Sequence, residues 1–225
     1  MNDDSREQKE DVPEKTRAIS LNEQAYLRFK QALITLSYKP GDYLNTAQVM
    51  ADLELGRTPV NQAIHRLAGE GLLQVIPRKG VMVAPLSIDD ALELIEVRLA
   101  NESLCMTLAC QRVTSSDIDA LRALNQHIAV AVEQRDRVNM MLLDRQFHQQ
   151  LAAIASNSRL SDILSVIHAQ AQRFWATTLS RESHMHEVIA EHEAIIAALA
   201  QQDIAAADAA SRAHILSFKR ALLAG

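Results

Sequence analysis

Long stretches of helix-forming residues constrain this chain more than any other feature. Ala, Leu, Ile, Glu, Gln and Arg fill much of its 225 residues, whereas aromatic residues make up only 4%. Most of these residue types have a high helix propensity. The six glycines and five prolines are too few for a low-complexity or collagen-like chain. The sequence therefore predicts a mainly α protein.

The same sequence argues against membrane insertion and secretion. No apolar run approaches the roughly 20 residues that a membrane span needs. The first fifteen residues are polar and lack the apolar core of a signal peptide. Cys105 and Cys110 face different sides of any helix, so a disulfide framework is not expected. We expect a cytoplasmic protein in a reducing compartment, with no membrane partner.

Charge is distributed unevenly along the chain. Residues 1–15 carry three basic and six acidic groups without apolar periodicity, which is typical of a disordered tail. Residues 16–85 carry eight Lys and Arg against five Asp and Glu, whereas residues 86–225 carry twelve against seventeen. A basic segment is compatible with nucleic-acid binding. Because the excess of basic residues is small, charge alone does not establish nucleic-acid binding, and the residue pattern has to be considered.

Residues 16–84 contain three helical patterns followed by two strand patterns. Apolar residues recur at helical spacing from Leu21 to Leu36. Thr46 is suited to cap a second helix, and Pro59 suits the first turn of a third. The expected elements are helices over 21–37, 46–53 and 58–69, and strands over 72–76 and 81–83 joined by Pro77-Arg78-Lys79-Gly80.

This order of elements is that of a winged helix-turn-helix. In that fold the third helix enters the major groove of DNA, and here the hairpin would form a wing with a basic tip. The alternative interpretation is a small helical domain with a solvated hairpin. The pattern of elements favours the DNA-binding domain.

Residues 55–73, which read LGRTPVNQAIHRLAGEGLL, resemble the recognition-helix signature of the GntR family of bacterial transcription regulators. Pro40-Gly41 upstream and Arg78-Lys79-Gly80 downstream also match that family's pattern. The resemblance covers about sixty residues and implies that the chain binds an operator in double-stranded DNA. The DNA-contacting residues implied by it are Thr46, Arg57, Thr58, Asn61, Gln62, His65, Lys79 and Gly80.

The sequence departs from the family at the centre of this signature. Members usually carry Arg-Glu after the Pro-Val pair, whereas this chain has Asn61-Gln62, and Gly56 replaces the usual Ser or Thr. Asn and Gln pair with adenine N6 and N7, whereas Arg pairs with guanine. We therefore expect an operator that is not centred on the family's usual guanine. The alternative is that Asn61 contacts only phosphate.

Residues 85–225 contain helical patterns and no strand pattern, and Pro85 marks the linker before them. Ser87 and Asp90 form a capping-box pattern at the start of the first helix. A six-helix bundle is therefore expected. Its helices are expected near 88–112, 116–134, 138–155, 158–180, 184–201 and 203–223.

Four polar residues fall on helix faces that periodicity assigns to the core. Asp144 and His148 share a face with Met140, Met141, Phe147, Leu151 and Ile154. His192 lies in line with Val188, Ile195 and Leu199, and His214 lies in line with Ile204, Ala207, Ser211, Phe218 and Leu222. Burying an unpaired carboxylate is costly, so Asp144 needs a partner or a cation.

One carboxylate and three imidazoles on inward faces suit a first-row divalent ion. Asp144 and His148 are four residues apart, which allows them to coordinate one ion jointly. The alternative is that each histidine is simply a hydrogen-bonded core residue, because the chain has eight histidines and some face inward by chance. We take zinc as the expected ion, with nickel, manganese and iron as alternatives.

Three motifs of this segment resemble the effector domain of the FadR-like subfamily of GntR regulators. They are DRQFH at 144–148, EHEAI at 191–195, and Asp203 followed by an Ala-rich helix with His214. The resemblance implies a helical bundle that binds a small carboxylate, often through a metal held by Asp144, His148, His192 and His214. Six helices are nearer the VanR-like branch than the seven-helix form. His184 and His186 are expected to be solvated in a loop.

The effector contacts are harder to assign from the sequence. Arg98 lies at the edge of the first bundle helix's apolar stripe, where the resemblance implies an arginine that reaches the ligand carboxylate. The alternative is an ordinary pair between Arg98 and Glu102. Arg173 and Trp175 are weaker candidates for lining the cavity, since both suit a dimer or domain interface as well.

The expected function is a metabolite-responsive regulator, acting as a repressor. Residues 1–15 would form the tail, 16–84 the DNA-binding domain, and 85–225 the effector and dimerisation domain. A homodimer is expected because a two-fold operator needs two recognition helices. A metal-sensing regulator is an alternative with the same ligands. A mononuclear metalloenzyme is a weaker one, since no dedicated general base accompanies the ligands and a hydrolase needs no winged helix.

Overall fold

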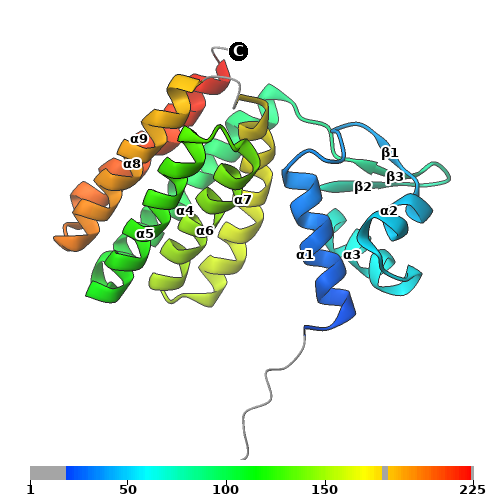
Figure 1. Ribbon diagram of the computed structural model, residues 1–225, viewed down its shortest axis with the longest axis horizontal. Coiled ribbons are helices and arrows are strands. Elements are labelled where there is room, and N and C mark those ends of the chain that lie inside the picture. The colour runs from blue at the N-terminus through cyan, green and yellow to red at the C-terminus, as the bar shows by residue number, and fades with distance from the viewer. Residues whose placement is uncertain (1–18, 179–181, 224–225) are drawn as a thin grey trace, which may run out of the picture.

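The computed structural model describes residues 19–178 and 182–223, and the tail predicted for residues 1–15 lies outside these ranges. Figure 1 shows two parts, an N-terminal part built around a small sheet and a bundle of long helices. The N-terminal elements are α1 (Leu21–Ile34), β1 (Tyr43–Leu44), α2 (Thr46–Leu53), α3 (Arg57–Gly69), β2 (Leu73–Ile76) and β3 (Gly80–Val83).

The N-terminal part is a winged helix-turn-helix with one strand that the sequence pattern did not predict. β3 lies between β1 and β2 and pairs antiparallel with both. The predicted hairpin is β2–β3, and the extra strand β1 pairs Tyr43 with Met82. A two-residue strand has too little alternation to be recognised in a sequence. Asn45, not Thr46, caps α2 by accepting a hydrogen bond from the Ala47 backbone at 2.9 Å.

The first helix also ends earlier than predicted. α1 stops at Ile34, and Leu36 adopts a positive φ of 58°, which a continuing helix does not allow. Thr35 closes the helix instead, because its hydroxyl donates to the Gln31 carbonyl at 2.9 Å. The apolar residues beyond Ile34 therefore extend the sequence periodicity without extending the helix.

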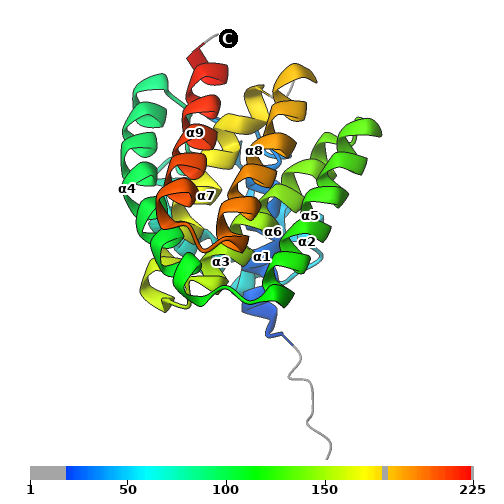
Figure 2. The ribbon, with the colours of Figure 1, turned by 90° about the vertical axis from the view of Figure 1, so that its left-hand side faces the viewer.

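The C-terminal part is a helical bundle, with α8 and α9 in front of α7 in Figure 2. Its six helices in the described ranges agree closely with the predicted spans. They are α4 (Ile88–Arg112), α5 (Ser115–Glu133), α6 (Arg137–Ile154), α7 (Ser158–Thr178), α8 (Glu182–Ala200) and α9 (Ile204–Leu223).

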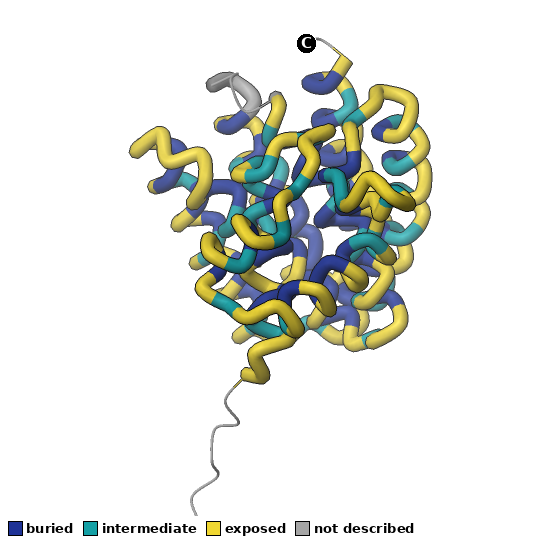
Figure 3. Tube along the Cα trace, turned by 90° about the vertical axis from the view of Figure 1, so that its right-hand side faces the viewer, coloured by how far each residue is buried: buried dark blue, intermediate teal, exposed yellow. Residues whose placement is uncertain are grey.

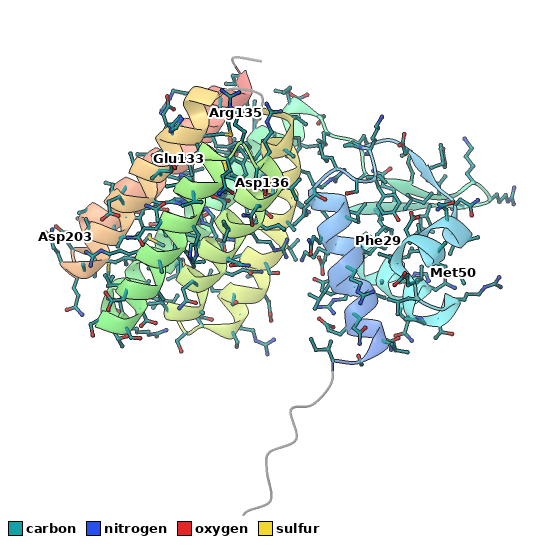
Figure 4. The ribbon with its side chains drawn as sticks, in the orientation of Figure 1. Phe29, Met50, Glu133, Arg135, Asp136 and Asp203 are labelled. Carbon is teal, nitrogen blue, oxygen red and sulfur yellow. The ribbon has the colours of Figure 1, made fainter. Side chains whose placement is uncertain are left out.

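Side-chain caps set several of these helix starts. Ser87 accepts from the Asp90 backbone at 3.0 Å, and Asp203 accepts from the Ala206 backbone at 3.0 Å. Thr114 forms a full capping box with Asp117, so it caps α5 in place of the serines that follow. Figure 4 labels two such capping residues, Asp136 before α6 and Asp203 between α8 and α9.

Two details of the bundle differ from the expectations drawn from the sequence. His184 and His186 lie within α8, not in a loop, although His186 is exposed as predicted. The sequence pattern places Ile204 on the inward face of the last helix, yet its side chain is 39% exposed. Ile204 is the first residue of α9, so no preceding turn of that helix covers its side chain.

Two apolar cores hold the molecule together, one in each part, and Figure 3 shows the buried segments inside an exposed shell. Phe29, labelled in Figure 4, is fully buried in the N-terminal core. Ala169 of α7 also belongs to that core, so the bundle contributes to the packing of the N-terminal part. Within the described ranges, no helix is both long and apolar enough to cross a membrane. Cys105 and Cys110 are buried free thiols.

Candidate metal centre and DNA-binding surface

Helices α6, α8 and α9 bring Asp144, His148, His192 and His214 together in the bundle. Each of the four is buried, and each offers a ligand atom within 4.8 Å of those of the others. Asp144 Oδ1 lies 3.4 Å from His192 Nε2 and 3.9 Å from His148 Nε2. The four inward-facing residues singled out from the sequence therefore meet in one cluster.

Burial sets the protonation of this cluster. It raises the pKa of the Asp144 carboxyl to about 6, and the neighbouring positive groups oppose that rise. It lowers the pKa of His148 and of His192 well below the usual range, so both imidazoles are neutral at pH 7. A neutral imidazole is the form that binds a metal.

The hydrogen bonds of the cluster leave nitrogen atoms without partners. Both ring nitrogens of His192 and Nδ1 of His148 are buried without a hydrogen-bond partner. His214 Nδ1 lies 2.8 Å from Glu191 Oε2, so that carboxylate orients the ring and leaves Nε2 to face the other ligands. Buried polar atoms are normally satisfied, so these residues fit a divalent ion.

A small cavity borders the cluster. Its volume is about 30 Å³, which is room for about two water molecules, since one occupies some 10–15 Å³ of such space. The polar part of its wall includes Arg98, Asp144, Arg145, His148, His168 and Gln172, and the apolar part includes Trp175, Val188 and Phe218. Trp175 thus lies in the cavity wall, the position for which it was a candidate.

Arg98 lines this cavity and is also paired with Glu102. Its Nε donates to Glu102 Oε1 at 2.6 Å, and both side chains are buried. His168 Nε2 lies 3.0 Å from the same oxygen, and the Ser211 hydroxyl donates to Oε2 at 3.4 Å. Burial alone would raise the pKa of Glu102, but Arg98 and His168 hold it well below its usual range. Both interpretations of Arg98 therefore agree with its position.

Arg173 does not line the cavity. It is buried on the other side of α7, where Nη2 donates to the Ala84 carbonyl in the linker. There it borders a groove of about 450 Å³ between the two parts, together with Gln74, Asp90 and Gln170. Its position is the domain interface, which was the alternative drawn from the sequence.

Sequence reasoning missed three polar residues of the cavity wall. His168 continues the buried positions Leu164 and Ala171 of α7, so the periodicity of that helix contained the signal. Gln172 is adjacent to this stripe and donates to the Met141 carbonyl at 3.0 Å. Arg145 follows Asp144 directly, and nothing in the spacing of the motif distinguishes it.

Five of the predicted DNA-contacting residues lie along α3. Arg57, Thr58, Asn61, Gln62 and His65 are exposed along α3, on the side opposite its buried apolar residues. That helix packs on α1 through Val60, Ala63, Ile64 and Leu67, all buried. The polar face of α3 is therefore available to a groove of DNA.

The other three predicted DNA-contacting residues lie on the wing and on α2. Lys79 and Gly80 are exposed at the β2–β3 turn, where Arg78 and Gly80 adopt φ values of 63° and 108°. Gly tolerates such a conformation, so Gly80 suits the tight turn of a wing. Thr46, at the first turn of α2, is half-buried. The β2–β3 turn thus exposes two basic residues, Arg78 and Lys79, as the sequence predicts for the tip of the wing.

Comparison with known families identifies both parts of the chain. Residues 21–83 match the gntR family of bacterial regulatory proteins, and residues 93–217 match the FCD domain. The second match covers more than half of the chain. Together the matches confirm the predicted fold class, a winged helix-turn-helix followed by a helical domain.

Relatives and solved structures agree with these matches. The Nta operon transcriptional regulator of Aminobacter aminovorans is 29% identical over 163 residues, which are 68% of this chain and 75% of the relative. The HTH-type transcriptional repressor RspR of Escherichia coli is 25% identical over 195 residues, 87% of this chain and 86% of the relative. The structure of E. coli McbR/YncC superposes with a TM-score of 0.85 at 20% identity, covering 92% and 99% of the chains, and supports the fold alone.

Proposed function

The chain belongs to the gntR family of bacterial regulatory proteins and carries an FCD domain, and from this premise we propose that it is a repressor controlled by a metal-dependent effector. It is a DNA-binding transcription regulator and not an enzyme. We place the DNA-binding domain at 16–84 and the effector domain at 85–225. Because this domain has six helices in the described ranges, we propose that the chain belongs to the VanR-like branch. Its place of action is the cytoplasm, where bacterial DNA is.

We assign a divalent ion to Asp144, His148, His192 and His214. The observation that carries this assignment is that four buried side chains offer ligand atoms within 4.8 Å of one another, while the ring nitrogens of His192 lack a hydrogen bond at 0% exposure. Three nitrogen donors and one carboxylate suit zinc, and they also accommodate nickel, manganese or iron. When bound, the ion supplies positive charge that attracts an anionic oxygen in the cavity.

The cavity supports a small organic acid as the effector. Arg98 and Arg145 line it beside the ligand cluster, so the wall carries two guanidinium groups, which pair well with a carboxylate. Its volume of about 30 Å³ limits the acid to a few atoms unless the wall moves. Arg98 is proposed to reach the acid while it keeps its pair with Glu102. Arg173 suits a role at the linker, where its guanidinium lies.

The exposed face of α3 supports operator recognition by a homodimer. Asn61 and Gln62 project from the part of α3 that would face base edges, and both amides match adenine. Lys79 at the wing and Arg57 at the start of α3 supply positive charge for phosphate. Two copies are needed to present two recognition helices to a two-fold operator.

The small cavity also favours a second candidate function. A volume of about 30 Å³ is filled by an ion and its remaining water ligands, so the ion could itself be the signal. In that case the chain is a metal sensor, and no organic acid is needed. Both candidates share the ligands and differ in what changes DNA affinity.

Metal analysis and DNA binding separate the two candidates. We expect one stoichiometric ion per chain in the purified protein, which EDTA removes with a loss of melting temperature. DNA selected from a random library by the protein is then titrated with zinc alone and with zinc plus small carboxylates. An effect of zinc alone supports the sensor, and an effect that needs the acid supports the effector. The metal assignment is wrong if no stoichiometric ion is found and EDTA changes neither melting nor binding.

A further inference from the structure

The DNA-binding domain is anchored to helix α7 through its first helix. Figure 1 shows α1 beside α7, and Ala169 of α7 is fully buried in the core of the N-terminal domain. Lys30 of α1, which is only 2% exposed, contacts the hydroxyl and the carbonyl of Ser165 at 3.5 and 3.4 Å. A buried ammonium group needs its partners, because their loss would leave a charge unpaired away from water. Polar contacts therefore hold α1 on α7 in addition to the apolar core.

The end of the recognition helix α3 is anchored to the same helix. Glu70 is the C-terminal cap residue of α3, and its carbonyl accepts a hydrogen bond from the side-chain amide of Gln170 on α7 at 2.8 Å. The Glu70 carboxylate also lies 2.7 Å from Lys30 Nζ, so the anchors on α1 and α3 are joined by one ion pair. The Gln170 amide therefore fixes the end of α3 opposite to Arg57, where the predicted DNA-contacting residues begin.

Gly71 allows this close approach between the end of α3 and α7. Its φ of 72° lies in the left-handed region, which favours glycine. A Cβ atom at position 71 would lie 2.8 Å from Gln170 Nε2, closer than van der Waals contact allows. Because the amide is the far end of a flexible side chain, it would swing away, and its hydrogen bond to the Glu70 carbonyl would be lost. A larger residue at this exposed position thus opens the anchor without entering the core.

The linker between the two domains has a third anchor on α7. Arg173 donates from Nη2 to the carbonyl of Ala84, which directly follows β3. The anchors run from Ser165 to Arg173, about 12 Å along α7 at 1.5 Å per residue. They hold α1, the end of α3 and the linker, which are separate segments of the chain. Contacts spread over this length oppose a rotation of the DNA-binding domain relative to the bundle.

We propose that this clamp, made by Ser165, Gln170 and Arg173 of α7, sets the spacing between the two operator half-sites that the protein reads. In a dimer, the distance and angle between the two recognition helices follow from how each DNA-binding domain sits on its bundle. Half-sites one helical turn apart lie on the same side of the duplex, so a fixed angle between these helices selects a fixed spacing. Gln170 and Gly71 are then positioning residues of the recognition helix. Their role rests on the homodimer proposed above.

Selection of DNA by the full-length protein tests the clamp. A random library first yields the half-site, and a second library then varies the number of base pairs between two copies of it. The wild type should prefer one spacing. It should lose about a hundredfold in affinity when the second half-site moves by half a turn of DNA, because only one recognition helix can then bind.

Two changes at Gln170 remove the hydrogen bond to Glu70. Gln170→Glu keeps the shape of the side chain without its donor, and Gln170→Ala removes the amide altogether. Without this bond the DNA-binding domain reorients more easily to reach a displaced half-site. Each variant should therefore lower the discrimination between the two spacings by about three- to tenfold, which is the contribution of one hydrogen bond.

Gly71→Ala tests the same contact from the other side. The added methyl group displaces the Gln170 amide, so a similar loss of discrimination is expected. Gly71→Ala combined with Gln170→Ala should lose no more than the larger single change, because both act on one contact. Gly41→Ala is the matched control, since Gly41 also has a positive φ, of 87°, but nothing lies within 4 Å of an added Cβ. It should carry the backbone strain and keep the wild-type spacing.

Affinity for a single half-site separates positioning from damage to the domain. Each variant should bind a single half-site as the wild type does, because the exposed face of α3 is unchanged. Circular dichroism checks the fold, and if Gly71→Ala does not fold, the two Gln170 variants decide the question.

The clamp and the homodimer fail in different ways. If the Gln170 variants keep both the spacing and the discrimination of the wild type, the clamp does not set the spacing, while the homodimer stands. If the wild type selects single half-sites with no fixed spacing, both the homodimer and the clamp are overturned.

Discussion

At the scale of single residues, the ligand cluster is explained by burial. His192 is 0% exposed and stacks on Phe147, with ring centroids 3.9 Å apart, so water cannot satisfy its nitrogens. The same burial lowers its pKa well below the usual range and keeps the ring neutral. A neutral, desolvated imidazole without partners is costly in an apolar core and well suited to a metal. Burial without hydrogen bonds therefore makes these side chains costly to the fold and also suits them to bind an ion.

Removing one ligand is expected to remove the ion and part of the stability. His148→Ala should abolish stoichiometric metal and lower the melting temperature, because a bound ligand stabilises by about 4 kcal/mol at a thousandfold excess over Kd. His214→Ala should behave in the same way. Elemental analysis and thermal melting measure both effects.

His186→Ala is the matched control, because that histidine is exposed on α8. It should change neither metal content nor melting. A His148→Ala variant that keeps a full complement of metal would contradict the four-ligand assignment.

The recognition helix offers a second test at the residue scale. Asn61→Ala should reduce discrimination between the selected operator and mismatched sites by about 1–3 kcal/mol, the usual contribution of a base contact. Lys79→Ala should weaken operator and random DNA alike and flatten the dependence of affinity on salt. Competition binding at several salt concentrations separates the two effects. If Asn61→Ala leaves discrimination intact, then Asn61 contacts phosphate and the adenine proposal fails.

At the scale of elements, α7 carries two faces with different tasks. Its cavity face holds His168 and Trp175, and its opposite face places Ala169 at 0% exposure in the N-terminal core. A small residue suits position 169 because α7 packs on α1 where this side chain is fully buried. α7 is therefore part of the C-terminal bundle in the chain, but its side chains pack in the cores of both domains.

Enlarging Ala169 should separate the two domains. Ala169→Leu adds volume to a filled core, which typically costs about 1–3 kcal/mol. We expect the midpoint of urea unfolding to fall and the linker near Ala84 to become more sensitive to protease. Asp162→Leu adds an apolar side chain at an exposed position of the same helix and should leave both unchanged. Equal behaviour of the two variants would show that Ala169 is not packed between the domains.

At the scale of the whole molecule, several large apolar side chains remain exposed on neighbouring helices. Val97 and Leu104 of α4 are 50% and 47% exposed, and Ile163 of α7 is 48% exposed. Val97 and Leu104 are seven residues apart and share one face of α4. We propose that these side chains form part of an interface between two copies of the chain. It agrees with the need for two recognition helices.

Assembly is therefore expected to depend on this face. Sedimentation analysis at micromolar concentration should give a dimer near twice the chain mass of 24.9 kDa. Leu104→Glu should shift the protein toward the monomer and weaken operator binding. His127→Glu introduces the same charge at an exposed position of α5 and should leave the dimer intact. A wild-type monomer that binds a palindromic operator tightly would contradict the dimer.

Local patterns in the sequence determined the elements and four polar residues of the core. The six bundle helices lie close to their predicted spans because apolar spacing and caps such as Ser87 and Asp203 act within one or two turns. Asp144, His148, His192 and His214 were predictable for the same reason, since helical periodicity alone assigns them to inward faces.

Only the tertiary structure decided which faces meet. The pairing of β1 with β3, the contact of His168 with Glu102, and the burial of Ala169 in the other domain's core join segments far apart in the chain. Periodicity specifies that a side chain faces inward, but it does not specify its neighbour, because that neighbour is set by packing between elements.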